Sequence, residues 1–213
     1  MTTSARILLG LVAYLLLGKL AFMAVPTALV DPGQAEDLTF AAIGVFAAMG
    51  LAGLGLSARA GFPPFYTGWR RLALPAGVGA SVGVVLAMVD RAHPLGIPNV
   101  AFPMALLLYP FGAIVSEIMF RLFPLPLLTW LISGLVLRGR FQDAVFGFCA
   151  VSTSLAEPLL QWGAMPEEPW FRALLFTHAL GMNLGAAFLF RRRGWLAALV
   201  LRLAFYVPWH LIR

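Results

Sequence analysis

A glutamate and an arginine, Glu117 and Arg121, stand four residues apart inside a long apolar stretch of this chain. On an α-helix, side chains four residues apart lie on the same face, so this pair can form an ion pair. An ionised side chain in the hydrocarbon of a membrane costs at least about 2.5 kcal/mol, so such residues face a protein interior or a water-filled cavity and usually mark function. A glutamate in such a cavity is a candidate general base for a water molecule.

Other ionisable residues stand in apolar segments of their own: Lys19 early in the chain, and Glu157, His178 and Arg202 in its second half. Because an unpaired charge is costly to bury, some of the charged side chains must meet one another. His178 is the histidine deepest within a predicted span and is therefore a candidate base. A hydrogen-bonded interior histidine is the alternative.

The composition predicts the fold class. Hydrophobic residues make up 61% of the chain and charged residues 11%, which excludes an ordinary soluble domain. Apolar runs close to the roughly 20 residues that span a bilayer recur along the whole length. We therefore expect an all-α, polytopic transmembrane helix bundle whose partner is the lipid bilayer. No paired-cysteine site, phosphate-binding glycine loop or nucleic-acid module is visible, so we expect no metal, no cofactor and no nucleic acid.

Residues 1–213 are expected to form a single integral membrane domain, because no long linker divides them. The predicted spans lie near residues 6–29, 38–57, 72–90, 101–122, 142–160, 170–190 and 195–211. Residues 123–137 are apolar but short, and they begin with two prolines, which kink or break helices. They either complete one crossing of residues 101–137 as a broken or re-entrant piece, giving seven segments, or span separately, giving eight.

The arginines between the spans favour seven segments. They are Arg59, Arg70, Arg71, Arg138, Arg140 and Arg191 to Arg193. Basic loops stay in the cytoplasm, and these arginines share one side only if residues 101–137 cross once. The N-terminus would then be cytoplasmic, and acidic residues 31–37 and 167–168 would be outside. Short loops and no targeting peptide favour a prokaryotic inner membrane. Trp195, at the start of the last span, is typical of an interfacial anchor.

Residues 105–206 resemble the CAAX-protease and bacteriocin-processing (CPBP, or Abi) intramembrane proteases. The first motif of that family is Glu-Glu-x-x-x-Arg with an aromatic residue before the Arg. Ser116-Glu117-Ile118-Met119-Phe120-Arg121 matches its second Glu, the aromatic residue and the Arg. The Gly181-x-x-x-Gly185 spacing and the basic turn at 191–194 follow in the order of the family. The resemblance implies a CPBP-like helical fold and hydrolysis of a membrane-bound peptide or protein substrate.

Several motif positions carry other residues. Ser116 replaces the first motif Glu, Glu157 replaces the His of the second motif, and Arg202 and Tyr206 replace the His and Asn of the third. Arginine stays charged at any relevant pH and cannot serve as a base or a metal ligand. Two alternatives follow. The chain is either an active protease, with Glu117 as base and the substituted residues as polar supports, or a pseudoprotease that binds membrane peptides.

If the second and third motifs face each other as in the family, Glu157 and Arg202 form an ion pair where the relatives have two imidazoles. We therefore predict this contact. A hypothesis from another class is a small transporter or channel component, with Glu117, Arg121, Glu157 and Arg202 as a polar pathway. Transporters are commonly built from repeats, and the two halves of this chain show none. That asymmetry favours the protease-like interpretation.

Overall fold

The computed structural model describes residues 2–24, 39–94, 100 and 102–211, and the regular elements in these ranges are all helical. Six helical stretches are long and apolar enough to cross a membrane, and a seventh, Trp195–His210, is shorter. The main helices are α1 (Thr3–Ala24), α3 (Phe40–Arg59), α4 (Ala73–Ala92), α5 (Ala105–Glu117), α6 (Pro124–Thr129), α7 (Gln142–Leu160), α8 (Pro169–Arg193) and α9 (Trp195–Tyr206). The all-α polytopic prediction is confirmed.

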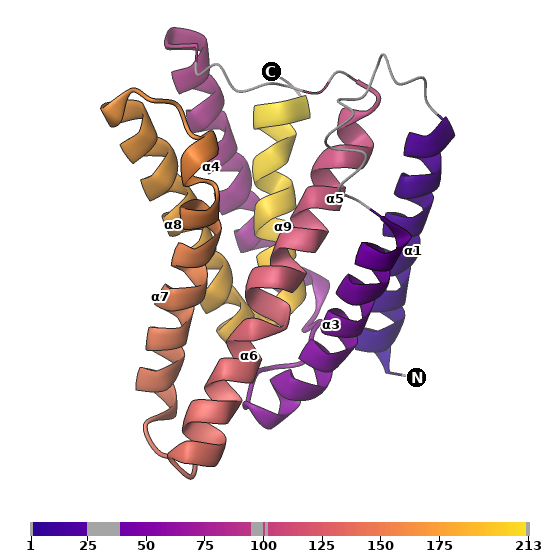
Figure 1. The fold of residues 1–213 in the computed structure, drawn as a ribbon, viewed down its shortest axis with the longest axis vertical. Coiled ribbons are helices and arrows are strands. Elements are labelled where there is room, and N and C mark those ends of the chain that lie inside the picture. Colours follow the sequence, from indigo (N-terminus) through magenta and orange to yellow (C-terminus); the bar gives the residue numbers. More distant parts are fainter. Residues whose placement is uncertain (1, 25–38, 95–99, 101, 212–213) are drawn as a thin grey trace.

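Residues 105–136 form one long helical rod, which runs through α5 and α6 in Figure 1. A π-helical turn, Ile118–Leu122, joins α5 to α6, and a second one, Trp130–Val136, ends the rod. Pro124 lies in the first turn of α6, directly after the π-helical turn. The prolines are thus absorbed without breaking the rod. The rod agrees with one crossing of residues 101–137 and not with the eight-segment alternative.

Basic segments from distant parts of the sequence meet at one end of the bundle. Arg191 donates to the carbonyl oxygen of Gly61 over 2.8 Å, and Arg193 donates to that of Arg71 over 3.2 Å. The N-terminus of α1 lies toward the same end (Figure 1). The arginines are therefore grouped as the seven-segment prediction requires. The predicted acidic loop at residues 31–37 lies outside the described residues.

α9 lies in the centre of the bundle, in contact with α4, α5 and α8 (Figure 1). Two glycines of α4 allow the backbones of α4 and α9 to approach each other closely. A Cβ atom on Gly79 would collide with the carbonyl oxygen of Leu201, and one on Gly83 would collide with that of Phe205. Small residues let membrane helices pack backbone to backbone in this way.

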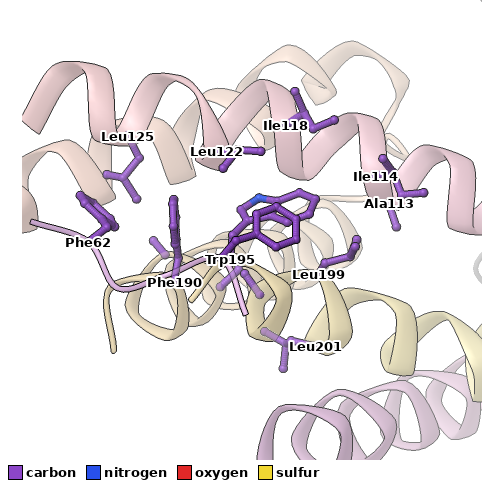
Figure 2. Close-up of a cluster of buried hydrophobic side chains, with 14 of the residues drawn as sticks. Phe62, Ala113, Ile114, Ile118, Leu122, Leu125, Phe190, Trp195, Leu199 and Leu201 are labelled. Atoms are coloured by element: carbon purple, nitrogen blue, oxygen red, sulfur yellow. The ribbon is translucent and has the colours of Figure 1, made fainter. Parts of the chain in front are cut away.

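An apolar core lies between the long rod and α9. Figure 2 shows the indole of Trp195 between the two, with Leu122 of the rod on the side that faces it. Phe65 packs on the same indole, with ring centroids 4.6 Å apart. Trp195 has no exposed surface, so its prediction as an interfacial anchor is wrong. The chain turns inward at Gly194, which places the first residue of α9 in the core.

Candidate functional site

Four ionisable side chains from three helical segments meet inside the bundle. Glu117 and Arg121 come from the long rod, Glu157 from α7 and Arg202 from α9. The first two have no exposed surface, and the other two are only 5% and 9% exposed. All four were singled out from the sequence, and the structure brings them together.

These four groups form a closed cycle of alternating charge, which we call the charge ring. Arg121 Nη1 lies 3.2 Å from Glu117 Oε1 and 3.2 Å from Glu157 Oε2. Arg202 Nε donates to Glu117 Oε1 over 2.8 Å, and its Nη1 and Nη2 donate to the two oxygens of Glu157, each over 2.8 Å. The last pair is bidentate, the strongest geometry between arginine and carboxylate. It is the Glu157–Arg202 contact expected from the sequence.

Charge balance explains how the charge ring can be buried. Each carboxylate contacts both guanidinium groups, so two negative and two positive charges cancel within one cluster. Desolvation of an ion pair is repaid only when the geometry is good and the remaining polar atoms are hydrogen-bonded. Most polar atoms of the charge ring meet that condition. Among the described residues, Glu117 Oε2 and Arg121 Nε are buried without a hydrogen-bond partner.

Two further polar side chains hold the charge ring in place. Asn183 of α8 accepts a 2.8 Å hydrogen bond from Arg202 Nη2 and donates to the carbonyl oxygen of Ser154 over 3.0 Å. Trp195 Nε1 donates to the carbonyl oxygen of Glu117 over 3.2 Å. The sequence interpretation assigned neither residue to the site. Asn183 could have been identified from the sequence, because an amide side chain in an apolar span needs a hydrogen-bond partner.

Trp195→Phe tests this support. The substitution is expected to lower the free energy of unfolding by about 1–3 kcal/mol, because the Glu117 carbonyl oxygen loses a donor in a buried place. The buried Cys149 is the chain's single cysteine, so its reaction with a maleimide dye during heating in detergent reports unfolding. Trp69→Phe is the control, since Trp69 is 76% exposed. Equal unfolding of the two variants would contradict the role of the indole.

A cavity of about 280 Å³ opens beside the charge ring, and we call it the polar cavity. It extends to the connection between α7 and α8 at residues 161–166. Its wall includes Glu157, His178, Asn183, Arg202, Tyr206 and Trp209. The rest of the wall is mainly apolar. A largely apolar pocket with a few convergent polar groups is the usual form of a ligand-binding site.

The other three predicted site residues lie outside the charge ring. His178 and Tyr206 line the polar cavity. His178 packs against Phe205, with ring centroids 4.8 Å apart, and makes no hydrogen bond to another described residue. Ser116 lines a different cavity, of about 340 Å³, whose wall also includes Tyr206. Residues next to each other on a helix point in different directions, which separates Ser116 from Glu117.

The charge ring is poorly arranged for hydrolysis. A general base must hydrogen-bond the water that it activates. Glu117 has no exposed surface: its Oε1 is held by two guanidinium groups, and its Oε2, although without a partner among the described residues, is buried. Both oxygens of Glu157 accept hydrogen bonds from arginine. In the described part of the chain, no group of three or more His, Cys, Asp or Glu side chains could hold a metal ion.

No protein-family model matches this chain, and no significant match was found among curated proteins or solved structures. Its sequence and structure together establish a polytopic helical membrane protein with four ion-paired residues buried in its centre.

Proposed function

We propose that this protein is a non-catalytic relative of the CPBP intramembrane proteases, which binds a membrane-associated peptide in the polar cavity. One observation carries the proposal. The positions that resemble the family's three motifs, on separate helices, lie within hydrogen-bonding distance of one another, yet closed ion pairs fill the place where a catalytic site would need a free base. A common ancestry accounts for the convergence, and the substitutions Glu157 and Arg202 account for the loss of catalysis.

The size and lining of the polar cavity support a peptide as ligand. Its volume of about 280 Å³ is too small for a helix, whose diameter is roughly 10–12 Å, but it can take a side chain or a chain end. Gln161, His178 and Tyr206 offer hydrogen bonds at its wall. In the proposed topology the basic end of the bundle lies in the cytoplasm of a prokaryotic inner membrane. The polar cavity then opens toward the opposite face.

The charge ring does not favour transport. Its four residues form a compact cycle rather than a row along the bundle, and buried apolar residues of the core, such as Leu125 and Trp195, lie between Arg121 or Arg202 and the basic segments that follow or precede them in the chain. A transport pathway would need polar side chains on both sides of this apolar core. We therefore propose no second function.

Filling the polar cavity tests peptide binding. Ala179 lines the polar cavity, whereas Ala173 of the same helix is exposed. In nanodiscs, anisotropy with a fluorescent library of short apolar peptides should show binding to the unmodified protein and to Ala173→Phe. Ala179→Phe should weaken binding roughly tenfold, since its ring occupies space that a buried apolar group of the ligand would use. Equal affinity of the two variants would contradict the proposed site.

The same peptides test the absence of catalysis. We expect no cleavage by the unmodified protein and no difference from Glu117→Gln, as judged by mass spectrometry of the peptides. Cleavage that disappears in Glu117→Gln would instead identify a working protease. Ion or solute flux into proteoliposomes that is lost in Glu117→Gln would favour a transporter.

A further inference from the structure

Two basic turns from distant parts of the sequence pack against each other at the basic end of the bundle. One is the 3₁₀ turn Trp69–Arg71, directly before α4, and the other is the end of α8 at residues 191–193. Arg193 Nη1 donates to the carbonyl oxygen of Arg71 over 3.2 Å, and Thr67 Oγ1 donates to that of Arg193 over 2.6 Å. We call Arg70, Arg71, Arg192 and Arg193 the basic patch.

Backbone contacts hold the two turns in a fixed relation. Leu196 donates its N–H to the carbonyl oxygen of Phe65 over 3.0 Å. A Cβ atom on Gly194 would collide with the carbonyl oxygens of Pro64 and Phe65, so the two segments are in direct backbone contact. The arginines of the basic patch are therefore carried by a rigid support, which lowers the entropy cost of binding a ligand.

The basic patch carries positive charge that the protein does not neutralise. Residues 57–72 and 186–196 contain no acidic residue. The side chains of Arg70, Arg71 and Arg192 are exposed and form no ion pair or hydrogen bond with another described residue. The neighbouring Arg191, by contrast, pairs with Asp143 over 3.5 Å. The basic patch is therefore open to an anion from outside the chain.

The place of the basic patch relative to the membrane indicates the class of anion. Its residues lie at the ends of two helical stretches that are long and apolar enough to span a bilayer, Trp69–Ala92 and Pro169–Arg193. Lipid headgroups lie at that depth, just outside the hydrocarbon. Trp69 is 76% exposed, and an exposed tryptophan at the end of a span is typical of the membrane–water interface. The anions present at that interface are phospholipid headgroups.

We infer that the basic patch binds the headgroup of an anionic phospholipid. Guanidinium groups bind phosphate through paired, charge-assisted hydrogen bonds. The phosphate of phosphatidylcholine is offset by the ammonium group of the same headgroup, whereas phosphatidylglycerol keeps a net negative charge, so phosphatidylglycerol is favoured. The basic patch shares no residue with the charge ring or the polar cavity. This inference therefore does not depend on the proposed peptide function, and either can fail alone.

Native mass spectrometry tests the lipid site. The full chain in a non-ionic detergent is titrated with phosphatidylglycerol, or with phosphatidylcholine that has the same acyl chains, and bound lipids are counted by mass. We expect phosphatidylglycerol to bind more tightly, and its advantage to shrink in about 1 M ammonium acetate, where the Debye length falls to about 3 Å. Arg71→Gln should lower the affinity for phosphatidylglycerol roughly fivefold, the effect of one arginine at an anionic membrane surface.

Arg91→Gln is the matched control. Arg91 is exposed in the last turn of α4 and forms no ion pair with another described residue, so this variant makes the same change in net charge at the opposite end of the helix. The 20 residues of α4 span about 30 Å, well beyond the Debye length, so the affinity should change less than about twofold. Reaction of Cys149 with dye during heating verifies that each variant is folded.

Arg138→Gln separates a defined site from diffuse charge. Arg138 is exposed and lies outside the basic patch, in the connection between the long rod and α7, so its loss should weaken binding less than Arg71→Gln does. Equal losses in these two variants would overturn the inference, because they would show a general effect of charge.

Four further results would also overturn the inference. Equal affinity for the two lipids would mean that the arginines only orient the chain in the membrane. Equal affinity of Arg71→Gln and Arg91→Gln for phosphatidylglycerol would place the lipid elsewhere. Binding of glycerol phosphate as tight as that of phosphatidylglycerol would identify a soluble phosphate ester as the ligand. Displacement of phosphatidylglycerol by a polyglutamate peptide would identify an acidic protein partner.

Discussion

Glu157→Gln is expected to lower the free energy of unfolding by about 3–5 kcal/mol, the cost of removing one partner from a buried ion-pair network. Glu157 accepts two 2.8 Å hydrogen bonds from Arg202 and two 3.2 Å hydrogen bonds from Arg121. After the substitution, two guanidinium groups share the single carboxylate of Glu117. A net positive charge then remains in a site that has almost no exposed surface. Thermal unfolding in detergent, followed by dye reaction at Cys149, measures the loss.

A double-mutant cycle separates pairing from general damage. Glu157→Gln combined with Arg202→Gln restores charge balance, so the double variant should lose clearly less stability than the sum of the two single variants. Asp143→Asn is the control, because Asp143 is 99% exposed in its 3.5 Å ion pair with Arg191 and should change stability by less than about 1 kcal/mol. Additive losses in the cycle would show that Glu157 and Arg202 act independently.

Charge patterning predicted the fold because the membrane limits where charge can lie. Arginines at 70–71, 138–140 and 191–193 required residues 101–137 to cross once, although Pro124 pointed to an interruption. The structure solves this conflict with a π-helical turn before Pro124, which the sequence does not reveal. A π-helical turn depends on which backbone carbonyl groups accept hydrogen bonds from donors outside the helix. The Trp195 indole, which donates to the carbonyl oxygen of Glu117, comes from a distant segment of the sequence.

The charge ring could be predicted in part for a related reason. A buried charge must find an opposite charge, so few pairings were open to Glu117, Arg121, Glu157 and Arg202. Neutral polar groups are less restricted, since one hydrogen bond satisfies them. Asn183 could have paired with many backbone groups, and its place beside Arg202 depends on the rotation of α8.

The position of Tyr206 shows how helix geometry places one predicted residue beside the charge ring but outside it. Tyr206 follows Arg202 by one helical turn, so it lies on the same face but farther along α9. It therefore lines the polar cavity next to the charge ring. The family resemblance groups Arg202 and Tyr206 into one motif. Both residues line the polar cavity, but only Arg202 forms ion pairs in the charge ring.

Gly79→Leu is expected to destabilise the protein by about 3 kcal/mol, at the upper end of the usual cost of overpacking. A Cβ atom at this position collides with the Leu201 carbonyl oxygen, a backbone atom that cannot move without shifting α9. α9 also carries Arg202, so separating α4 from α9 is expected to disturb the charge ring as well. Reaction of Cys149 with dye during heating measures the loss.

Gly77→Leu is the matched control on the same helix. Gly77 is exposed, and a Cβ atom there has no neighbour within 4 Å, so leucine should be accommodated on the outer surface of α4 with a change below about 0.5 kcal/mol. Gly79→Ala serves as the milder variant if Gly79→Leu does not fold. A Gly79→Ala protein as stable as Gly77→Ala would contradict the close contact of α4 with α9, because even one methyl group has no room at Gly79.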